Sequence, residues 1–282
     1  MEHREGIFQG YKGTNLFCQY WIPDGKIKAI LLIVHGLADH SGRFINLVTK
    51  YLPKGYAIYS YDQRGHGQSP GLKGYIDKFS CFVDDLDQFL RYIRKKHSET
   101  KIYIIGHSIG GTIAATFAVS QQKEFNGLIL SGALIKPGAS VSKILITIAP
   151  ILSLLIPKIG LYTIDASSIS RDEVVVKNYI NDPSVYRGKI RTRLGIEILK
   201  GMQALRYRIA QISLPILILH GSDDRLSEPE SSRILYEGVS SVDKTIKIYD
   251  GFYHEIFNEP GYEKVLADVE DWLEAHIHSE ML

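Results

Sequence analysis

One serine in this chain stands in a pattern that suits nucleophilic catalysis. Residues 106–110 read Gly-His-Ser-Ile-Gly, directly after the apolar run 101–105 and directly before the helix-like stretch 111–121. Glycines two positions on either side of Ser108 permit a sharp turn between a strand and a helix. Such a turn holds the hydroxyl at the carboxyl edge of a sheet, beside a helix N-terminus that favours an anion. These flanking elements favour a nucleophilic Ser108 over a glycine-rich turn with an incidental serine.

A serine hydroxyl needs a general base, and the base needs an acid that orients it. With this kind of turn, the acid and then the histidine follow the serine in the chain, each after a later strand. Asp223 and Asp224 follow the apolar run 215–220, and His254 follows the run 245–249. Of the ten histidines, only His254 has the required place in the order. His254 is therefore the predicted base, while the residues alone leave open which aspartate is the acid.

A tetrahedral oxyanion also needs backbone N–H donors. One donor is expected from Ile109, which follows the serine, and the other from the loop after the first apolar run, 29–34. That loop begins with His35, and Gly36 permits a close approach of the backbone to a carbonyl oxygen. The N–H of Leu37 is the candidate second donor, with an ordinary strand-to-helix turn as the alternative.

The remaining pattern predicts how these residues are brought together. Short β-branched or aromatic runs alternate with longer amphipathic stretches, which is typical of βαβ units and of a parallel sheet covered on both faces. The expected strands are 29–34, 56–61, 101–105, 128–131, 215–220 and 245–249, and the expected helices are 43–51, 79–96, 111–121 and 263–276. The predicted fold class is therefore α/β, with a mostly parallel central sheet flanked by helices.

The alternation fails between residues 136 and 211. This segment holds 12 basic and 5 acidic residues, whereas the whole chain has a formal charge of only +2. Helix-like stretches at 172–180 and 190–209 predict a helical cap, or lid, over the strand ends. We therefore expect a core made of 1–135 and 212–282, with the cap at 136–211.

One stretch of the expected cap raises the question of a membrane. Residues 144–156 are uncharged and apolar, and Pro150 interrupts them. A spanning helix needs about 20 apolar residues, so these 13 are too few. The stretch is expected to form either a buried helix or an apolar surface that touches lipid.

Composition narrows the class of protein. The chain has 282 residues, of which 45% are hydrophobic and 23% charged, which excludes disorder, collagen and coiled coil as overall classes. The near balance of 33 basic and 31 acidic residues does not suggest a dedicated nucleic-acid binder. Cys18 and Cys81 provide neither a disulfide framework nor a metal-binding spacing. With no signal peptide apparent at the N-terminus, the expectation is a cytoplasmic enzyme without a metal.

Five segments resemble the monoacylglycerol lipases of the α/β-hydrolase superfamily. They are HGLADHSGR (35–43), YDQRGHGQS (61–69), GHSIGG (106–111), HGSDDRL (220–226) and YHEIFNEP (253–260). The resemblance implies an α/β-hydrolase fold with a helical cap inserted before the acid-bearing strand. It also implies a serine hydrolase that cleaves monoacylglycerol to glycerol and a free fatty acid without a metal or an organic cofactor.

The resemblance carries specific residues with it. The family pattern G-[ST]-x-D-R places the acid at Asp224, and the family supports Ser108 as nucleophile and His254 as base. It likewise supports Leu37 and Ile109 as the oxyanion donors.

Two further residues are implied near the glycerol end, Asp39 and Arg43, although the family often has glutamate where this chain has Asp39. The apolar stretch 144–156 is expected to form the entrance for an acyl chain. The basic cap is expected to make peripheral contact with a membrane or lipid surface.

Other activities use the same residues. A lysophospholipase or a broad carboxylesterase needs the same three side chains, and an acyltransferase needs only an alcohol that outcompetes water. A ligand-binding homologue without activity is the alternative from another class, and the complete set of serine, aspartate and histidine argues against it.

Overall fold

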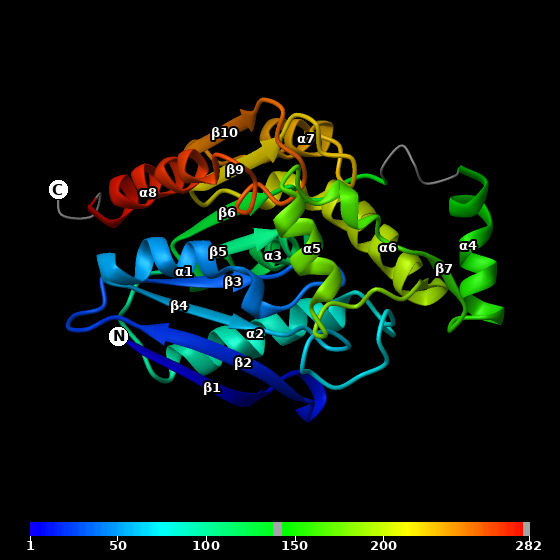
Figure 1. Ribbon diagram of the computed structural model, residues 1–282, viewed down its shortest axis with the longest axis horizontal. Coiled ribbons are helices and arrows are strands. Elements are labelled where there is room, and N and C mark those ends of the chain that lie inside the picture. The colour runs from blue at the N-terminus through cyan, green and yellow to red at the C-terminus, as the bar shows by residue number, and fades with distance from the viewer. Residues whose placement is uncertain (138–142, 279–282) are drawn as a thin grey trace.

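The computed structural model describes residues 1–137 and 143–278, and its centre is an eight-stranded sheet. The strands lie side by side in the order β1-β2-β4-β3-β5-β6-β9-β10 (Figure 1). β1 and β2 are antiparallel to their neighbours, and all other neighbours are parallel. The strands are β1 (Glu2–Gln9), β2 (Asn15–Ile22), β3 (Ala29–Val34), β4 (Tyr56–Tyr61), β5 (Ile102–His107), β6 (Gly127–Ser131), β9 (Ile216–Gly221) and β10 (Lys244–Tyr249).

Helices cover both faces of this sheet and form two apolar layers. α2 (Ser80–Arg94), α3 (Ile109–Gln121) and α7 (Glu230–Gly238) pack on one face, and α1 (Ile45–Tyr51) and α8 (Tyr262–His278) pack on the other. Every residue of β3, β4, β5 and β6 is buried. Strands that are covered on both faces need continuous apolar runs, which is why these runs were recognisable in the sequence.

The expected core strands and helices are all present, and their ends differ from expectation by at most two residues. β1, β2 and α7 were not predicted from the sequence. β1 reads EHREGIFQ and lies at the edge of the sheet, where most of its side chains are exposed. An exposed edge strand lacks the continuous apolar pattern of a central strand, so nothing in its sequence marked it.

Between β6 and β9 the chain leaves the sheet, over the residues expected to form the cap. This stretch contains α4 (Lys143–Leu155), β7 (Gly160–Tyr162), α5 (Glu173–Asn181), β8 (Ile190–Arg191) and α6 (Thr192–Arg208). We call residues 136–211 the cap segment. The helix expected over 190–209 begins two residues late, because Ile190 and Arg191 pair with β7 in a small antiparallel sheet.

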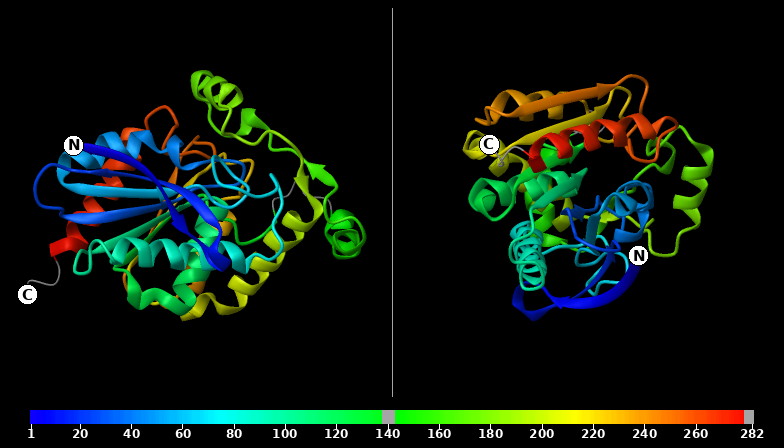
Figure 2. Two further views of the ribbon diagram at one scale, coloured as in Figure 1. Left: turned by 90° about the horizontal axis from the view of Figure 1, so that it is seen from below. Right: turned by 90° about the vertical axis from the view of Figure 1, so that its left-hand side faces the viewer.

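α4 stands at one end of the molecule, beyond α6, whereas the start of β1 and the end of α8 lie toward the opposite end (Figures 1 and 2). Pro150 lies inside this helix. Several of its apolar side chains face outward, including Ile151, Leu154 and Leu155. Within the described part of the chain, no helix is both long enough and apolar enough to cross a membrane.

Candidate active site

Ser108 lies at a sharp turn between β5 and α3. Its backbone angles are φ 55° and ψ −123°, in a region that a residue with a side chain seldom adopts. A Cβ atom at Gly110 would lie 2.1 Å from the carbonyl oxygen of Val34, and one at Gly106 would lie 2.7 Å from the carbonyl oxygen of Gly110. Only glycine fits at both positions, so the turn has the strand–turn–helix context that the motif predicts.

The loops after β9 and β10 meet at the same edge of the sheet. At Gly221 a Cβ atom would lie 2.3 Å from the carbonyl oxygens of both Phe252 and Tyr253, so glycine allows the two loops to touch. This approach places Asp224 against His254, whose Nδ1 lies 2.7 Å from Asp224 Oδ2.

The structure also distinguishes the two neighbouring aspartates. Asp224 is buried, whereas Asp223 is exposed and accepts a hydrogen bond from the hydroxyl of Ser222. Asp223 makes no ion pair with its neighbour Arg225 among the described residues; Arg225 instead donates a hydrogen bond to Tyr253. Asp224 is thus the aspartate that faces His254.

The carboxylate of Asp224 is fixed by four contacts. Oδ1 accepts the N–H groups of Leu226 and Ser227, at 2.8 and 2.9 Å. Oδ2 contacts both His254 and Nε2 of His220, the latter at 3.1 Å. Burial alone would raise the pKa of Asp224, but the two histidines outweigh it and hold this pKa well below its ordinary range. Asp224 therefore stays ionised beside His254.

His254 owes its electrostatic environment chiefly to burial and to Asp224. Burial lowers the pKa of His254, but the charge and the hydrogen bond of Asp224 raise it by more, so the net shift is upward. The ring of His107 lies 4.7 Å away. Burial, followed by the repulsion of His254, lowers the pKa of His107 to about 3, so His107 stays neutral.

The loop expected to supply the second oxyanion donor runs directly against the serine. A Cβ atom at Gly36 would lie 3.2 Å from Cβ of Ser108 and 3.3 Å from Cδ2 of His107. Among the described residues, the N–H groups of Leu37 and Ile109 have no hydrogen-bond partner. Both are therefore available to an oxygen atom bound beside Ser108.

Asp39 and Arg43 belong to a buried cluster whose third member is Glu255. Nη1 and Nη2 of Arg43 bind the two carboxylate oxygens of Glu255 at 2.6 and 2.7 Å, and Nη1 lies 3.2 Å from Oδ1 of Asp39. The ring of Tyr179 covers the guanidinium at 4.7 Å. Burial raises the pKa of Asp39, whereas Arg43 outweighs burial at Glu255 and lowers the pKa of that carboxyl.

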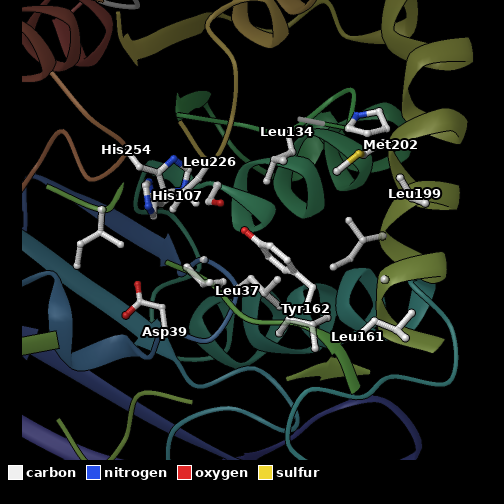
Figure 3. Close-up of a pocket in the computed structure, with 18 of the residues that line it drawn as sticks. Leu37, Asp39, His107, Leu134, Leu161, Tyr162, Leu199, Met202, Leu226 and His254 are labelled. Atoms are coloured by element: carbon white, nitrogen blue, oxygen red, sulfur yellow. The ribbon is translucent and has the colours of Figure 1, made fainter. Parts of the chain in front are cut away.

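Several of these groups border a cavity of about 350 Å³. Ser108, His254, Asp39 and Glu255 line it, whereas Arg43 lies behind the two carboxylates. In Figure 3, His254, His107 and Asp39 lie toward one end of the cavity and Leu161, Leu199 and Met202 toward the other. The cavity therefore has a polar end at the serine and an apolar end along α6.

The wall of the apolar end differs from expectation. No described residue of 144–156 lines the cavity, so the described part of that stretch does not form the entrance for an acyl chain. The β7–β8 region and α6 line the apolar end instead, since α4 stands beyond α6. The apolar lining residues are Leu134, Leu161, Ile164, Ile169, Ile190, Ile196, Ile198, Leu199, Met202 and Leu226.

Three further residues of this site carry no signal in the sequence. Glu255 follows His254 directly, but an acidic residue in a loop is ordinarily solvated. His220 ends the apolar run 215–220, and nothing in the sequence predicts its contact with Asp224. Gly132 adopts φ 56°, and a Cβ atom there would lie 3.3 Å from Nδ1 of His254. No local signal marks these contacts, because each one depends on the meeting of distant loops.

The described residues contain no group of three or more histidine, cysteine, aspartate or glutamate side chains placed to hold a metal ion.

Comparison with known proteins identifies the family. A family model described as "Serine aminopeptidase, S33" matches residues 25–261. The chain is 33% identical over 273 residues to a monoacylglycerol lipase of Mycolicibacterium smegmatis, which covers 97% of this chain and 98% of that protein. It is also 33% identical over 268 residues to a monoglyceride lipase of Rattus norvegicus, covering 94% of this chain and 88% of that one. The chain belongs to the monoacylglycerol lipase-like α/β-hydrolases.

A solved structure of this family supports the same conclusion. A soluble variant of the monoglyceride lipase of Saccharomyces cerevisiae, in complex with a substrate analog, is 25% identical with a TM-score of 0.88. The match covers 98% of this chain and 95% of that one. The expected α/β-hydrolase fold is confirmed, and the chain is a serine hydrolase of this family.

Proposed function

We propose that this protein is a carboxylic ester hydrolase that cleaves monoacylglycerol to glycerol and a free fatty acid. The observation that carries the proposal is a single cavity with two unlike ends. Ser108, His254 and the carboxylates of Asp39 and Glu255 line one end, and mostly apolar side chains line the other, with Arg191 and Thr192 among them. A substrate with a small polar alcohol and one long acyl chain matches both ends when its ester carbonyl lies at Ser108.

In the first half of the reaction, Ser108 Oγ attacks the ester carbonyl carbon and His254 Nε2 takes the hydroxyl proton. Asp224 keeps the proton of His254 on Nδ1 and stabilises the imidazolium that forms. The N–H groups of Leu37 and Ile109 donate to the carbonyl oxygen as it gains negative charge. Each such donor typically contributes about 3 kcal/mol.

His254 then gives its proton to the glycerol oxygen, the ester bond breaks and the acyl group stays on Ser108. Water repeats the sequence: His254 takes a proton from the water, the hydroxide attacks the acyl carbon, and the proton returns to Oγ as the fatty acid leaves. Ser108 and His254 are not hydrogen-bonded to each other among the described residues. Contacts of this kind commonly tighten only when a substrate is bound.

The glycerol is proposed to bind at the end where Asp39 and Glu255 face the cavity. Carboxylate oxygens accept hydrogen bonds, and the two free hydroxyls of a monoacylglycerol are donors. Arg43 holds both carboxylates from behind, which offsets much of the cost of keeping two acids buried. In this proposal, Asp39 and Glu255 accept the glycerol hydroxyls and Arg43 holds the two carboxylates in place.

We further propose that the cap segment works as a lid whose outer surface contacts lipid. Ile151, Leu154 and Leu155 on α4 are 62–76% exposed, and the cap segment carries an excess of basic residues. Exposed apolar side chains with basic residues around them are typical of contact with an anionic lipid surface. Co-sedimentation with phosphatidylglycerol vesicles is expected to exceed that with phosphatidylcholine vesicles; no binding to either would contradict the proposal.

The substrate proposal is tested by fatty-acid release from monooleoylglycerol, dioleoylglycerol and lysophosphatidylcholine, with the Ser108→Ala variant as the blank. We expect the monoacylglycerol to be cleaved with the highest kcat/KM, because a second acyl chain or a phosphocholine group is too large for the small polar end of the cavity. Equal or faster cleavage of the lysophospholipid would leave the roles of Ser108 and His254 intact and overturn the choice of substrate.

A further inference from the structure

The loop that carries Leu37 is bound by the cap segment as well as by the core. The carbonyl oxygen of Ala38 accepts the N–H of Tyr186 at 2.9 Å. His40 Nε2 lies 2.9 Å from Oδ2 of Asp182. Both partners come from the short connection between α5 and β8, 142 residues further along the chain in the case of Asp182.

These bonds act on the middle of the loop, where the core holds only the side chain of Asp39, through Arg43 at 3.2 Å. Among the described residues, no core residue bonds the backbone of 37–39. The core binds the two ends: His35 accepts the backbone N–H of Gln63 at 2.9 Å, and the N–H of Ser41 donates to Asp62 at 2.8 Å. Between these ends, Ala38 has φ 65°, an uncommon and costly conformation for a residue other than glycine. A strained loop keeps such a conformation only where its surroundings enforce it.

The side-chain bond has a defined direction. His40 Nδ1 accepts the N–H of Gly42 at 3.1 Å, which leaves Nε2 to donate to Asp182 Oδ2. The other oxygen of Asp182 accepts the N–H of Ser184 at 2.8 Å, so the carboxylate is fixed within its own turn. His40 and Asp182 are only 14% and 28% exposed, which limits competition from water.

We propose that Asp182 and His40 are positioning residues for the oxyanion hole. Together with the Tyr186–Ala38 bond, their contact holds the backbone around Leu37 so that its N–H points to the space beside Ser108. The cap segment thereby contributes to the chemical step, even for an ester too short to reach the apolar end. The inference rests on the proposed donor role of Leu37, and it is independent of which lipid is the substrate.

The test uses p-nitrophenyl butyrate, whose short chain has little need of the apolar end. Complete loss of one oxyanion donor lowers kcat by about 100- to 1,000-fold, so a displaced donor in Asp182→Ala is expected to lower kcat by about tenfold. KM is expected to stay within about twofold. Inhibition by a short alkyl trifluoromethyl ketone, whose adduct with Ser108 places an oxyanion in the hole, is expected to weaken by the same factor as kcat.

A matched control comes from the same segment. Asp172 accepts the N–H of Val174 at 2.8 Å, as Asp182 accepts that of Ser184, but it makes no bond to the loop. Asp172→Ala is therefore expected to leave kcat and the ketone inhibition constant unchanged. Thermal unfolding of both variants reports whether each keeps its fold.

The second variant acts from the other side of the bond. His40→Asn keeps an acceptor for the N–H of Gly42 but is too short to reach Asp182. Its kcat and its ketone inhibition constant are expected to match those of Asp182→Ala. The double variant is expected to lose no more of either than each single variant does. This variant also tests the proposal if Asp182→Ala does not fold.

Three results would overturn the inference: unchanged ketone inhibition in Asp182→Ala, a loss confined to oleoyl esters, or an equal loss in Asp172→Ala. Failure of the substrate proposal has a different signature. There, the wild-type protein would cleave p-nitrophenyl butyrate but show no preference for monooleoylglycerol.

Discussion

The core and the cap segment hold their side chains in different ways. All residues of β3 and β5 are buried, and the buried Asp224 and His254 lie on loops at the carboxyl edge of this sheet. α4, in contrast, leaves most of its described apolar side chains exposed. A packed sheet fixes the geometry that proton transfer needs, whereas the cap segment lines the apolar end of the cavity through β7, β8 and α6. Changes in the core should therefore affect every ester, and changes in the cap segment should affect particular ones.

The two regions are nevertheless joined at the site. The cap segment binds the loop of Leu37 through Asp182 and Tyr186, and the carbonyl oxygen of Ile169 accepts the N–H of Glu255 at 2.8 Å, next to His254. Substitutions in the cap segment are thus expected to change the choice of substrate and to leave the chemical step unchanged, except at these contacts.

The largest effect is expected from Ser108→Ala. Removing the nucleophile should lower hydrolysis of both monooleoylglycerol and p-nitrophenyl butyrate by at least about 10⁴-fold. The strained φ of 55° remains with alanine, so the unfolding temperature should change little. The purified variant is to be assayed on both esters; turnover near the wild-type rate on either would contradict the role of Ser108.

Asp224→Asn is expected to lower kcat by about 10³- to 10⁴-fold and to change its pH dependence. Protonated His254 cannot accept the proton of Ser108, so activity falls as pH drops through the pKa of His254. Asp224 raises that pKa above the ordinary value of 6.5. The acid limb of kcat/KM should therefore lie above pH 6.5 in the wild type and shift to lower pH in the variant. An unchanged inflection point would show that the group that titrates is not paired with Asp224.

Leu199→Trp is expected to slow the cleavage of a long-chain ester and to leave that of a short-chain ester nearly unchanged. Leu199 lines the apolar end of the cavity, and a larger side chain should shorten the space for a long acyl chain. Cleavage of monooleoylglycerol should fall by about tenfold, which corresponds to about 1.4 kcal/mol, and that of p-nitrophenyl butyrate should stay within twofold. Tyr207→Trp on the exposed side of the same helix is the control, since Tyr207 is 81% exposed. An equal loss on both esters would place Leu199 in the chemical step.

The smallest effect is expected from Leu154→Ser on α4. An exposed side chain away from the site should change the free energy of unfolding by no more than about 0.5 kcal/mol. Turnover of p-nitrophenyl butyrate in solution should stay unchanged, and binding to phosphatidylglycerol vesicles should weaken. Lost turnover in solution would mean that α4 belongs to the active site and not to its outer surface.

Much of the core could be predicted from sequence because its signals are local. Residues 29–34 and 101–105 are continuous apolar runs, and the glycines around Ser108 must be close to it in the chain. The order of serine, aspartate and histidine then follows from the fold class. The choice of Asp224 as the proposed acid followed only from the family resemblance. In the structure Asp223 is exposed, whereas Asp224 is buried and contacts His254.

The remaining features depend on contacts between distant segments. β1 pairs with β2 at an edge where polar side chains are tolerated, so its sequence resembles that of a loop. Glu255 acquires its role only when it meets Arg43, 212 residues earlier. The apolar character of 144–156 was plain, but hydrophobicity alone does not say which neighbour a helix packs against.

The central claim is that Ser108 is the nucleophile at the polar end of the cavity. A fluorophosphonate reacts covalently with an activated serine, and mass spectrometry of the digested protein locates the adduct. We expect one adduct per chain, on the peptide that contains Ser108, with activity lost in proportion to labelling and no adduct in Ser108→Ala. An adduct on a different serine, or full inactivation without any adduct at Ser108, would contradict the claim.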